Sequence, residues 1–234
     1  MPGKKPLSEL IRPQSFSEFT GQEHLKEQIQ HLMQQSRPSS LLFFGPPGCG
    51  KSTLALLTAR ALNRKSIRLS APETNLSTLR KQMEHHEVLI LDEIHRFSKA
   101  QQDYFLPYLE TGEFILLATT TENPSFSLTR QLLSRLHVLR LRPLSRSELL
   151  HIAQKGVSQL NREMREESLQ LLVSVSQGDA RTLLNLVEYS ATLDQKSLEP
   201  DKLQQLLPEI VQRGDRDGDS HYELASALIK SIRG

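Results

Sequence analysis

Residues 45–53 have the sequence GPPGCGKST, and this stretch constrains the fold more than any other part of the chain. It follows a short apolar run, Leu41–Phe44, and precedes Ser52–Leu62, where apolar residues recur at helical spacing. A strand, a glycine-rich turn and a helix in this order are the context that a Walker A phosphate-binding loop requires. The glycines let the backbone turn tightly and aim successive N–H groups at an anion beside the helix N-terminus. The sequence therefore predicts a triphosphate site, the alternative being a glycine-rich turn that only caps a helix.

The side chains of this loop predict how ATP and Mg²⁺ would be held. Lys51 supplies a positive charge for the β and γ phosphates, and Ser52 offers a hydroxyl to the metal. Cys49 occupies a variable position of the motif and has no predicted chemical role. The residues that we expect to contact the nucleotide are Gly45, Pro46, Pro47, Gly48, Cys49, Gly50, Lys51, Ser52 and Thr53.

Two adjacent carboxylates end another predicted strand. Residues 88–93 have the sequence VLILDE, in which four apolar residues precede Asp92 and Glu93. Ligands of open α/β sheets bind at the carboxyl ends of the strands. Asp92 is predicted to order the magnesium shell with Ser52, and Glu93 to polarise the water that attacks the γ phosphate. A buried strand that ends in two solvated acids is the alternative, and the phosphate loop upstream argues against it.

The next apolar run ends in three threonines, Thr119, Thr120 and Thr121. Their hydroxyls would lie beside the γ phosphate if this strand lies between the one before the phosphate loop and the one before Asp92. We take Thr120 as the candidate γ-phosphate sensor, and purely structural threonines remain the alternative.

The first part of the chain alternates apolar runs with helical patterns, which predicts a parallel sheet covered by helices. The predicted strands are Leu41–Phe44, Ser66–Leu69, Val88–Leu91, Phe114–Ala118 and His137–Leu141. The predicted helices between and around them are Leu25–Gln34, Ser52–Leu62, Leu76–Met83, Lys99–Leu109 and Thr129–Ser134. We therefore predict an α/β nucleotide-binding domain over residues 1–143.

After Pro143 the strand signals stop and helical patterns continue. The predicted helices there are Ser147–Leu160, Glu166–Ser176, Asp179–Leu193 and Asp201–Leu207, with Ser145 and Asp179 as candidate N-caps. This predicts a small all-α domain over residues 144–211. Residues 212–234 are predicted to be a linker, Gln212–Ser220, and the start of a further helical domain with a helix over Tyr222–Ile232.

Composition excludes several classes of protein. The chain has one cysteine, so an intramolecular disulfide framework is excluded, and it has no apolar run long enough to cross a bilayer. Lysine and arginine total 29 against 27 acidic residues, so any DNA contact must come from a local patch. The polar start, Met1–Leu10, lacks a secretory signal. The cytoplasm fits these features best. His85 and His86 have no metal-ligand partners at useful spacing, and we interpret them, like His95, as structural or solvated residues.

Four further stretches resemble the replication-associated recombination protein A family of AAA+ ATPases. They are DEIHRFSKAQQDYFLPYLETGEF at 92–114, TTENPSFSLTRQLLSR at 120–135, GDAR at 178–181 and GDSHYELASALIKSIRG at 218–234. The resemblance implies a P-loop AAA+ sheet domain followed by a helical lid. It also implies that the chain stops before a C-terminal domain that assembles tetramers.

The resemblance assigns roles that spacing alone does not. It implies that Arg135 is an arginine finger acting in a neighbour's ATP site, and that Arg181 is the sensor 2 arginine of the lid. Arg12 and Pro13 resemble an N-terminal motif over the adenine and sugar, with Leu7 and Ile11 as apolar neighbours of the base. Without the family, either of the arginines Arg135 and Arg181 would be interpreted as a solvated helix residue.

Two hypotheses of function follow from these features. The first, which the resemblance implies, is a DNA-dependent ATPase that remodels DNA at stalled or gapped forks, acting on single-stranded regions and duplex ends at inter-subunit ATP sites. Single-strand-binding protein and the replisome are the partners that the resemblance implies. The second is a nucleotide-controlled binding switch similar to a clamp-loader subunit. Arg96 and Lys99 are candidate phosphate contacts, with a solvated surface as the alternative.

Overall fold

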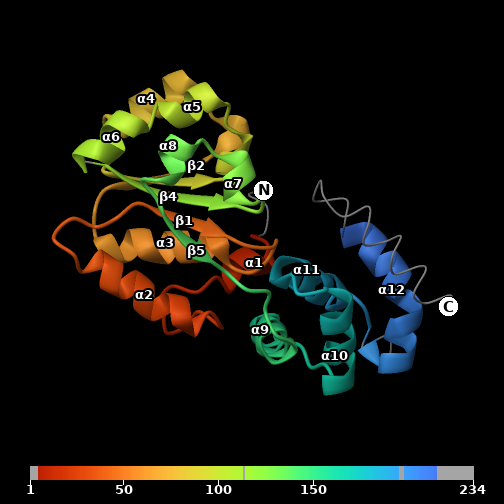
Figure 1. Ribbon diagram of the computed structural model, residues 1–234. Coiled ribbons are helices and arrows are strands. Elements are labelled where there is room, and N and C mark those ends of the chain that lie inside the picture. The colour runs from red at the N-terminus through yellow and green to blue at the C-terminus, as the bar shows by residue number, and fades with distance from the viewer. Residues whose placement is uncertain (1–4, 113, 195–197, 215–234) are drawn as a thin grey trace. The chain divides into compact units, whose positions relative to one another are not determined.

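The computed structural model of the chain describes residues 5–112, 114–194 and 198–214 (Figure 1). The chain divides into two compact units. One runs from Pro13 to Pro143, and the other combines the residues up to Arg12 with those from Leu144 onward.

The unit from Pro13 to Pro143 is built on a five-stranded sheet with the strand order β2-β3-β4-β1-β5. All neighbouring strands are parallel. Strand β4 therefore lies between β1 and β3, as the proposed position of the threonines requires. The predicted strands are confirmed, with ends that differ by at most two residues. They are β1 (Leu41–Phe44), β2 (Ser66–Ser70), β3 (Val88–Asp92), β4 (Ile115–Thr120) and β5 (His137–Arg140).

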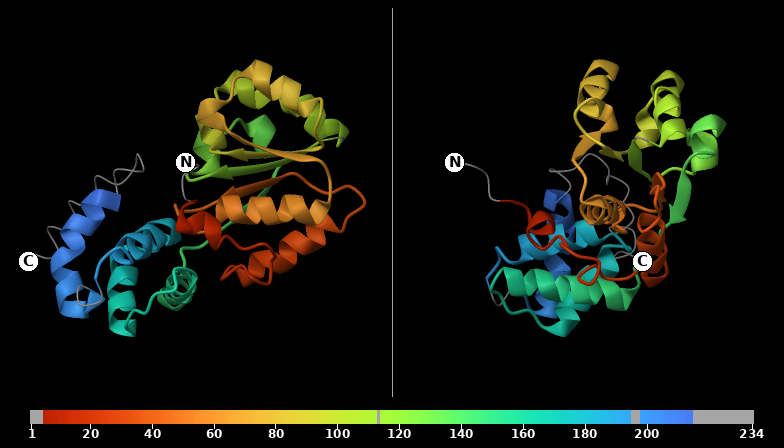
Figure 2. Two further views of the ribbon diagram at one scale, coloured as in Figure 1. Left: turned by 180° about the vertical axis from the view of Figure 1, so that it is seen from behind. Right: turned by 90° about the vertical axis from the view of Figure 1, so that its left-hand side faces the viewer.

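Helices cover both faces of this sheet (Figures 1 and 2). Alternate strand residues point to opposite faces, so Phe43 packs in the cluster under α2 and α3 while Leu42 packs in the cluster on the other side. Helices α2 (Glu23–Met33) and α3 (Lys51–Leu62) form one layer. The other layer contains α4 (Leu76–Met83), α5 (Lys99–Asp103), α6 (Leu106–Thr111), α7 (Pro124–Ser127) and α8 (Arg130–Leu133), with the 3₁₀ turns η1 (Ala71–Glu73) and η2 (Ile94–Arg96).

The single helix predicted over Lys99–Leu109 is wrong, because the structure has two helices there. Helix α5 begins with a Ser98 capping box and ends at Asp103. Helix α6 begins at Leu106 with Pro107 in its first turn. Proline has no N–H to donate to the residue four positions earlier, and its ring would collide with that carbonyl, so one continuous helix cannot pass Pro107.

The second unit is helical. Its elements are α1 (Leu7–Leu10), α9 (Arg146–Gln159), α10 (Glu166–Val175), α11 (Ala180–Ser190) and α12 (Pro200–Gly214). Both predicted N-caps are confirmed: Ser145 forms a capping box with Glu148, and the Asp179 carboxylate accepts hydrogen bonds from the N–H groups of Arg181 and Thr182.

Two predicted boundaries differ from the structure. The first residues group with the helical unit, because Leu7 is fully buried in its core and the Leu7 N–H donates to the Glu188 carboxylate at 2.9 Å. The linker predicted from Gln212 begins too early, since α12 runs on to Gly214. The rest of that linker and the helix predicted over Tyr222–Ile232 lie outside the described residues.

Candidate nucleotide-binding site

The phosphate loop joins β1 to α3 at the carboxyl edge of the sheet. The Gly45 N–H donates to the Thr120 carbonyl at 3.3 Å, which ties the loop to β4. Gly50 has a φ of +96°, and a Cβ there would lie 2.5 Å from Cζ of Phe19. Among the described residues no side chain caps α3 at Gly50, so the first N–H groups of this helix are available to an anion. This geometry fits a phosphate group.

Lys51 is held inside this loop. Its side chain is buried, and Nζ donates to the carbonyl oxygens of Gly45 at 2.9 Å and Pro46 at 2.6 Å. A phosphate is a charged acceptor and binds an ammonium more strongly than a neutral carbonyl does. We therefore expect a bound triphosphate to draw Nζ away from one or both carbonyls.

Asp92, the last residue of β3, accepts hydrogen bonds from three other elements. Its Oδ1 accepts from the Ser52 hydroxyl at 2.6 Å and from the Thr119 hydroxyl at 2.9 Å. Its Oδ2 accepts from Nε of Arg68 at 2.7 Å. The structure thus brings together the predicted metal residues Ser52 and Asp92, and adds Arg68 from β2.

These contacts determine the charge of Asp92. Burial raises the pKa of this carboxyl. The pKa is lowered more strongly by the hydrogen bond from Ser52, by the positive charge and hydrogen bond of Arg68, and by the hydrogen bond from Thr119. The net effect is a pKa below the ordinary value of 3.8. Asp92 is therefore an anion at neutral pH.

Ser52 and Asp92 fit a hydrated magnesium ion. Mg²⁺ prefers oxygen ligands and binds through one or two carboxylates, waters and substrate phosphates. Among the described residues there is no cluster of three His, Cys, Asp or Glu side chains that would form a metal site without the nucleotide. The hydroxyl of Ser52 and the carboxylate of Asp92 would hold the ion together with phosphate oxygens.

Glu93 lies directly after this strand in a left-handed conformation, with a φ of +58°. This turn places Ile94 in the core while Glu93 stays exposed. The Glu93 N–H faces Thr119 Oγ1 at 3.3 Å. A side chain other than glycine costs energy in this region and persists where its surroundings fix it, often at functional sites. The role of Glu93 with water stays a prediction.

The two threonines at the end of β4 have different neighbours. Thr119 contacts Asp92 and the Glu93 N–H, whereas Thr120 Oγ1 lies 3.1 Å from His95 Nδ1 and accepts from the Glu122 N–H at 3.1 Å. Consecutive strand residues point to opposite faces, which explains the difference. Thr120 stays the predicted γ-phosphate sensor, and Thr119 is an additional residue that positions Asp92.

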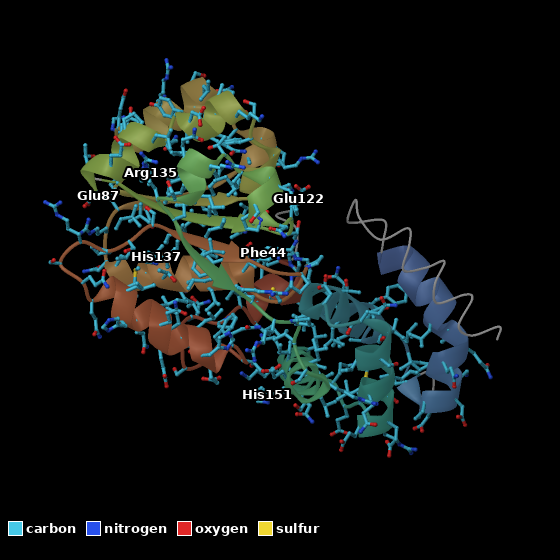
Figure 3. All side chains as sticks on the ribbon, viewed as in Figure 1. Phe44, Glu87, Glu122, Arg135, His137 and His151 are labelled. Carbon is cyan, nitrogen blue, oxygen red and sulfur yellow. The ribbon has the colours of Figure 1, made fainter. Side chains whose placement is uncertain are left out.

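Arg135 lies away from this site, at the amino edge of the sheet. It precedes β5, whose first residue, His137, pairs with the first residue of β1, Leu41. The phosphate loop follows β1 at the other edge, and Figure 3 shows Arg135 and His137 on one side and Phe44 and Glu122 on the other. The Arg135 guanidinium forms an ion pair with Glu110 and donates to the Gln131 carbonyl at 2.7 Å. Arg135 is therefore not part of the site in its own sheet unit.

The remaining predicted residues lie in the helical unit or at the boundary between the two units. Arg12, which pairs with Glu9, and Arg181, the second residue of α11, belong to the helical unit, and Pro13 begins the sheet unit. Their roles toward a nucleotide stay predictions. The sequence resemblance places Leu7 beside the adenine. In the structure the Leu7 side chain is fully buried in the core of the helical unit, where it contacts other apolar side chains.

The sheet order, the phosphate loop after β1 and the acidic pair after β3 define a P-loop nucleotide-binding protein of the AAA+ class, with an additional helical unit. Comparisons with known proteins agree. The family described as the Holliday junction DNA helicase RuvB P-loop domain matches residues 11–138. The family described as the AAA C-terminal domain matches residues 158–233.

Curated relatives narrow the family. The chain is 36% identical to the replication-associated recombination protein A of Haemophilus influenzae and 33% identical to that of Escherichia coli, over 98% of its own length and 57% of each relative. It is 39% identical to an AAA domain-containing protein of Mycobacterium tuberculosis, of which it covers 55%. It belongs to the replication-associated recombination protein A family of AAA+ ATPases. The chain spans little more than half the length of these relatives.

A solved structure supports the fold assignment. The RuvB Holliday junction branch migration motor of Thermotoga maritima is 25% identical, with a TM-score of 0.71 over 88% of this chain and 72% of that one. None of the helices within the described part of the chain is long and apolar enough to cross a membrane.

Proposed function

We propose that the protein binds ATP with Mg²⁺ at the loop between β1 and α3 and hydrolyses it. The observation that carries the proposal is the contact between Ser52 of the phosphate loop and Asp92 of β3, which brings the two predicted metal residues within 2.6 Å. Lys51 binds the β and γ phosphates, and Glu93 accepts a proton from the attacking water or orients it. When bound, Mg²⁺ neutralises the charge that develops on the phosphates.

We propose further that each site is completed by another copy of the chain. Arg135 and the phosphate loop lie at opposite edges of the sheet, separated by at least the length of β5, about 13 Å at the usual rise per residue. An arginine so placed reaches the transferring phosphoryl group only in a neighbouring subunit. The ion pair with Glu110, at a half-exposed position, keeps the guanidinium near the surface in the single chain.

The proposed work of the ATPase is remodelling of DNA at stalled or gapped replication forks. The support comes from the relatives, whose names refer to replication-associated recombination and to Holliday junction branch migration. Arg96 and Lys99 are exposed just after the Asp92–Glu93 turn and are available to backbone phosphates. Contacts of this kind weaken as salt rises.

ATP turnover with and without DNA tests this function. We expect single-stranded DNA or blunt duplex ends to raise the turnover of the parent protein, and about 0.5 M salt to abolish the gain, because phosphate contacts are lost through counterion release. The variant Lys51→Ala should show no turnover in either case. Turnover that is indifferent to every DNA tested would contradict the DNA proposal and leave the ATPase proposal standing.

Strand separation distinguishes a remodeller from a nucleotide-controlled switch. A remodeller must change the DNA, whereas a switch only changes the occupancy of a partner. We expect the protein to separate strands from a blunt duplex end with ATP, and not with a non-hydrolysable analogue. Equal binding of DNA with both nucleotides and no separation with either would favour the switch.

A further inference from the structure

Arg68 is a charged residue in the middle of an edge strand, and its side chain reaches one of the proposed metal residues. It lies in β2, in register with Ile90 of the neighbouring β3. In-register residues of parallel strands point to the same face, and so do Ile90 and Asp92, two positions apart. Arg68 therefore points along the face that carries the Asp92 carboxylate, and its Nε donates to Asp92 Oδ2 at 2.7 Å.

The hydrogen bonds to Asp92 occupy both of its oxygens. Two hydroxyls donate to Oδ1, and Arg68 donates to Oδ2. Within the described residues, Asp92 is the only acidic partner of Arg68. The Asp92 side chain is 14% exposed and that of Arg68 is 38% exposed, so Arg68 is the more exposed partner of the ion pair. Arg68 can thus leave Asp92 without losing a buried position.

We propose that Arg68 is a built-in counter-cation for Asp92, which holds the carboxylate before metal binds and competes with Mg²⁺ for it. The inference rests on the proposed Mg²⁺–nucleotide site. A cation that enters beside Ser52 and Asp92 meets a carboxylate whose charge Arg68 already partly neutralises, so Mg²⁺ and Arg68 compete for it. The same guanidinium adds positive charge near the phosphates of a nucleotide that arrives without metal.

This role has opposite effects on nucleotide affinity with and without the metal. Loss of the Arg68 charge should weaken metal-free nucleotide binding, because one attractive cation is missing. It should also strengthen the contribution of Mg²⁺, because Asp92 is then unpaired. A purely structural arginine would lower both affinities by a similar factor. The ratio of the metal-free dissociation constant to the Mg²⁺ dissociation constant therefore separates the two roles.

Titration of a fluorescent ATP analogue, once in EDTA and once across a series of Mg²⁺ concentrations, measures this ratio. We expect Arg68→Gln to raise the ratio by about threefold to tenfold, a range set by a half-exposed charge in a high effective dielectric. The Mg²⁺ concentration at half effect should fall with it. Arg68→Lys keeps the charge and should lie nearer to the parent.

Arg64→Gln is the matched control. It removes the same charge from a residue just before β2, where Arg64 pairs with Glu87 at 3.8 Å, at the opposite end of the strand from Asp92. We expect its ratio to equal that of the parent. The proposal would be overturned if Arg68→Gln had the same ratio as the parent, or if Arg64→Gln changed the ratio as much as Arg68→Gln does. It would also be overturned if the circular dichroism spectra showed that both Arg68 variants are unfolded at the assay temperature, because Arg68 would then have a structural role. A parent that does not bind the analogue at all would instead contradict the proposed function.

Discussion

The hydroxyl of Ser52 and the carboxylate of Asp92 form a hydrogen bond of 2.6 Å between α3 and β3. These residues are 40 positions apart in the chain, and the parallel sheet brings them together at one edge. This contact places the two proposed magnesium residues side by side at the carboxyl edge of the sheet.

The lowered pKa of Asp92 predicts how this site affects stability. Because the folded pKa lies below 3.8, the ionised carboxylate stabilises the fold fully above about pH 4, and the contribution disappears as the pH falls through the folded pKa. Urea unfolding of the parent and Asp92→Asn should show a gap in unfolding free energy at pH 6 that narrows toward pH 3. Ser52→Ala removes one of the lowering contacts and should reduce the gap. A gap that widens on acidification would contradict the assignment.

Replacing Gly50 with alanine should destabilise the fold through a steric clash, and the same replacement at Gly112 serves as the control. An alanine Cβ at Gly50 would meet the Phe19 ring at 2.5 Å, in addition to the cost of a positive φ. Gly112 also has a positive φ, +69°, but nothing in the described part of the chain lies within 4 Å of the point that its Cβ would occupy. We expect Gly112→Ala to cost about 1 to 2 kcal/mol of stability from backbone strain alone, and Gly50→Ala to cost more and to weaken nucleotide binding. Equal costs in thermal unfolding would show that Phe19 moves aside freely.

The threonine pair predicts a division of roles. Thr119→Val removes the hydroxyl that donates to Asp92, so it should alter the Mg²⁺ dependence of nucleotide binding. Thr120→Val removes the hydroxyl that contacts His95 and the Glu122 N–H, and as the predicted sensor it should lower turnover at saturating Mg²⁺–ATP. Steady-state kinetics across Mg²⁺ concentrations distinguishes them. If Thr120→Val keeps the parent turnover, the sensor assignment is wrong.

Arg135 predicts complementation between two inactive variants. The Lys51→Ala subunit cannot bind ATP at its own site but can still supply Arg135 to a neighbouring subunit. The Arg135→Ala subunit keeps an intact ATP site but cannot supply an arginine finger. Arginine fingers accelerate phosphoryl transfer by about 10³- to 10⁵-fold where they act. A mixture of the two variants should therefore recover turnover that neither has alone, and the specific activity of the parent should rise with protein concentration.

The control for this experiment is the parent under the same conditions. Where the parent assembles and hydrolyses ATP, a mixture that stays inactive would show that Arg135 does not act across an interface. The same conclusion would follow if the parent activity per subunit were independent of concentration.

Local patterns predict most of the fold and the main site residues. Elements that depend on neighbours within a few residues are present in the structure as predicted. They are the strand before GPPGCGKST, the strand that ends at Asp92, and the N-caps Ser145 and Asp179. Pro107 also indicates locally that the helix breaks between α5 and α6. The apolar residues on both sides of it keep a helical spacing, which by itself favours one continuous helix.

Contacts between distant segments are harder to predict. The pairing of Arg68 with Asp92 depends on the register of β2 against β3, which no local pattern determines. An arginine inside an otherwise ordinary strand next to the Asp92 strand is the only available signal. A short apolar segment does not indicate which core it joins, so the sequence does not predict that Leu7 packs in the core of the helical unit.

In the proposed ATPase, Glu93 acts on the water that attacks the γ phosphate. Glu93→Gln keeps the size of the side chain and replaces the carboxylate with an amide, which cannot accept the proton. The most direct measurement is therefore nucleotide affinity and ATP turnover of Glu93→Gln and the parent, with Mg²⁺ and DNA ends present. We expect Glu93→Gln to bind ATP with the parental affinity and to turn it over at least about 10²-fold more slowly, since about 10²-fold is the lower end of a general-base contribution. Turnover at the parent rate would contradict this expectation, because another group would then hold the water.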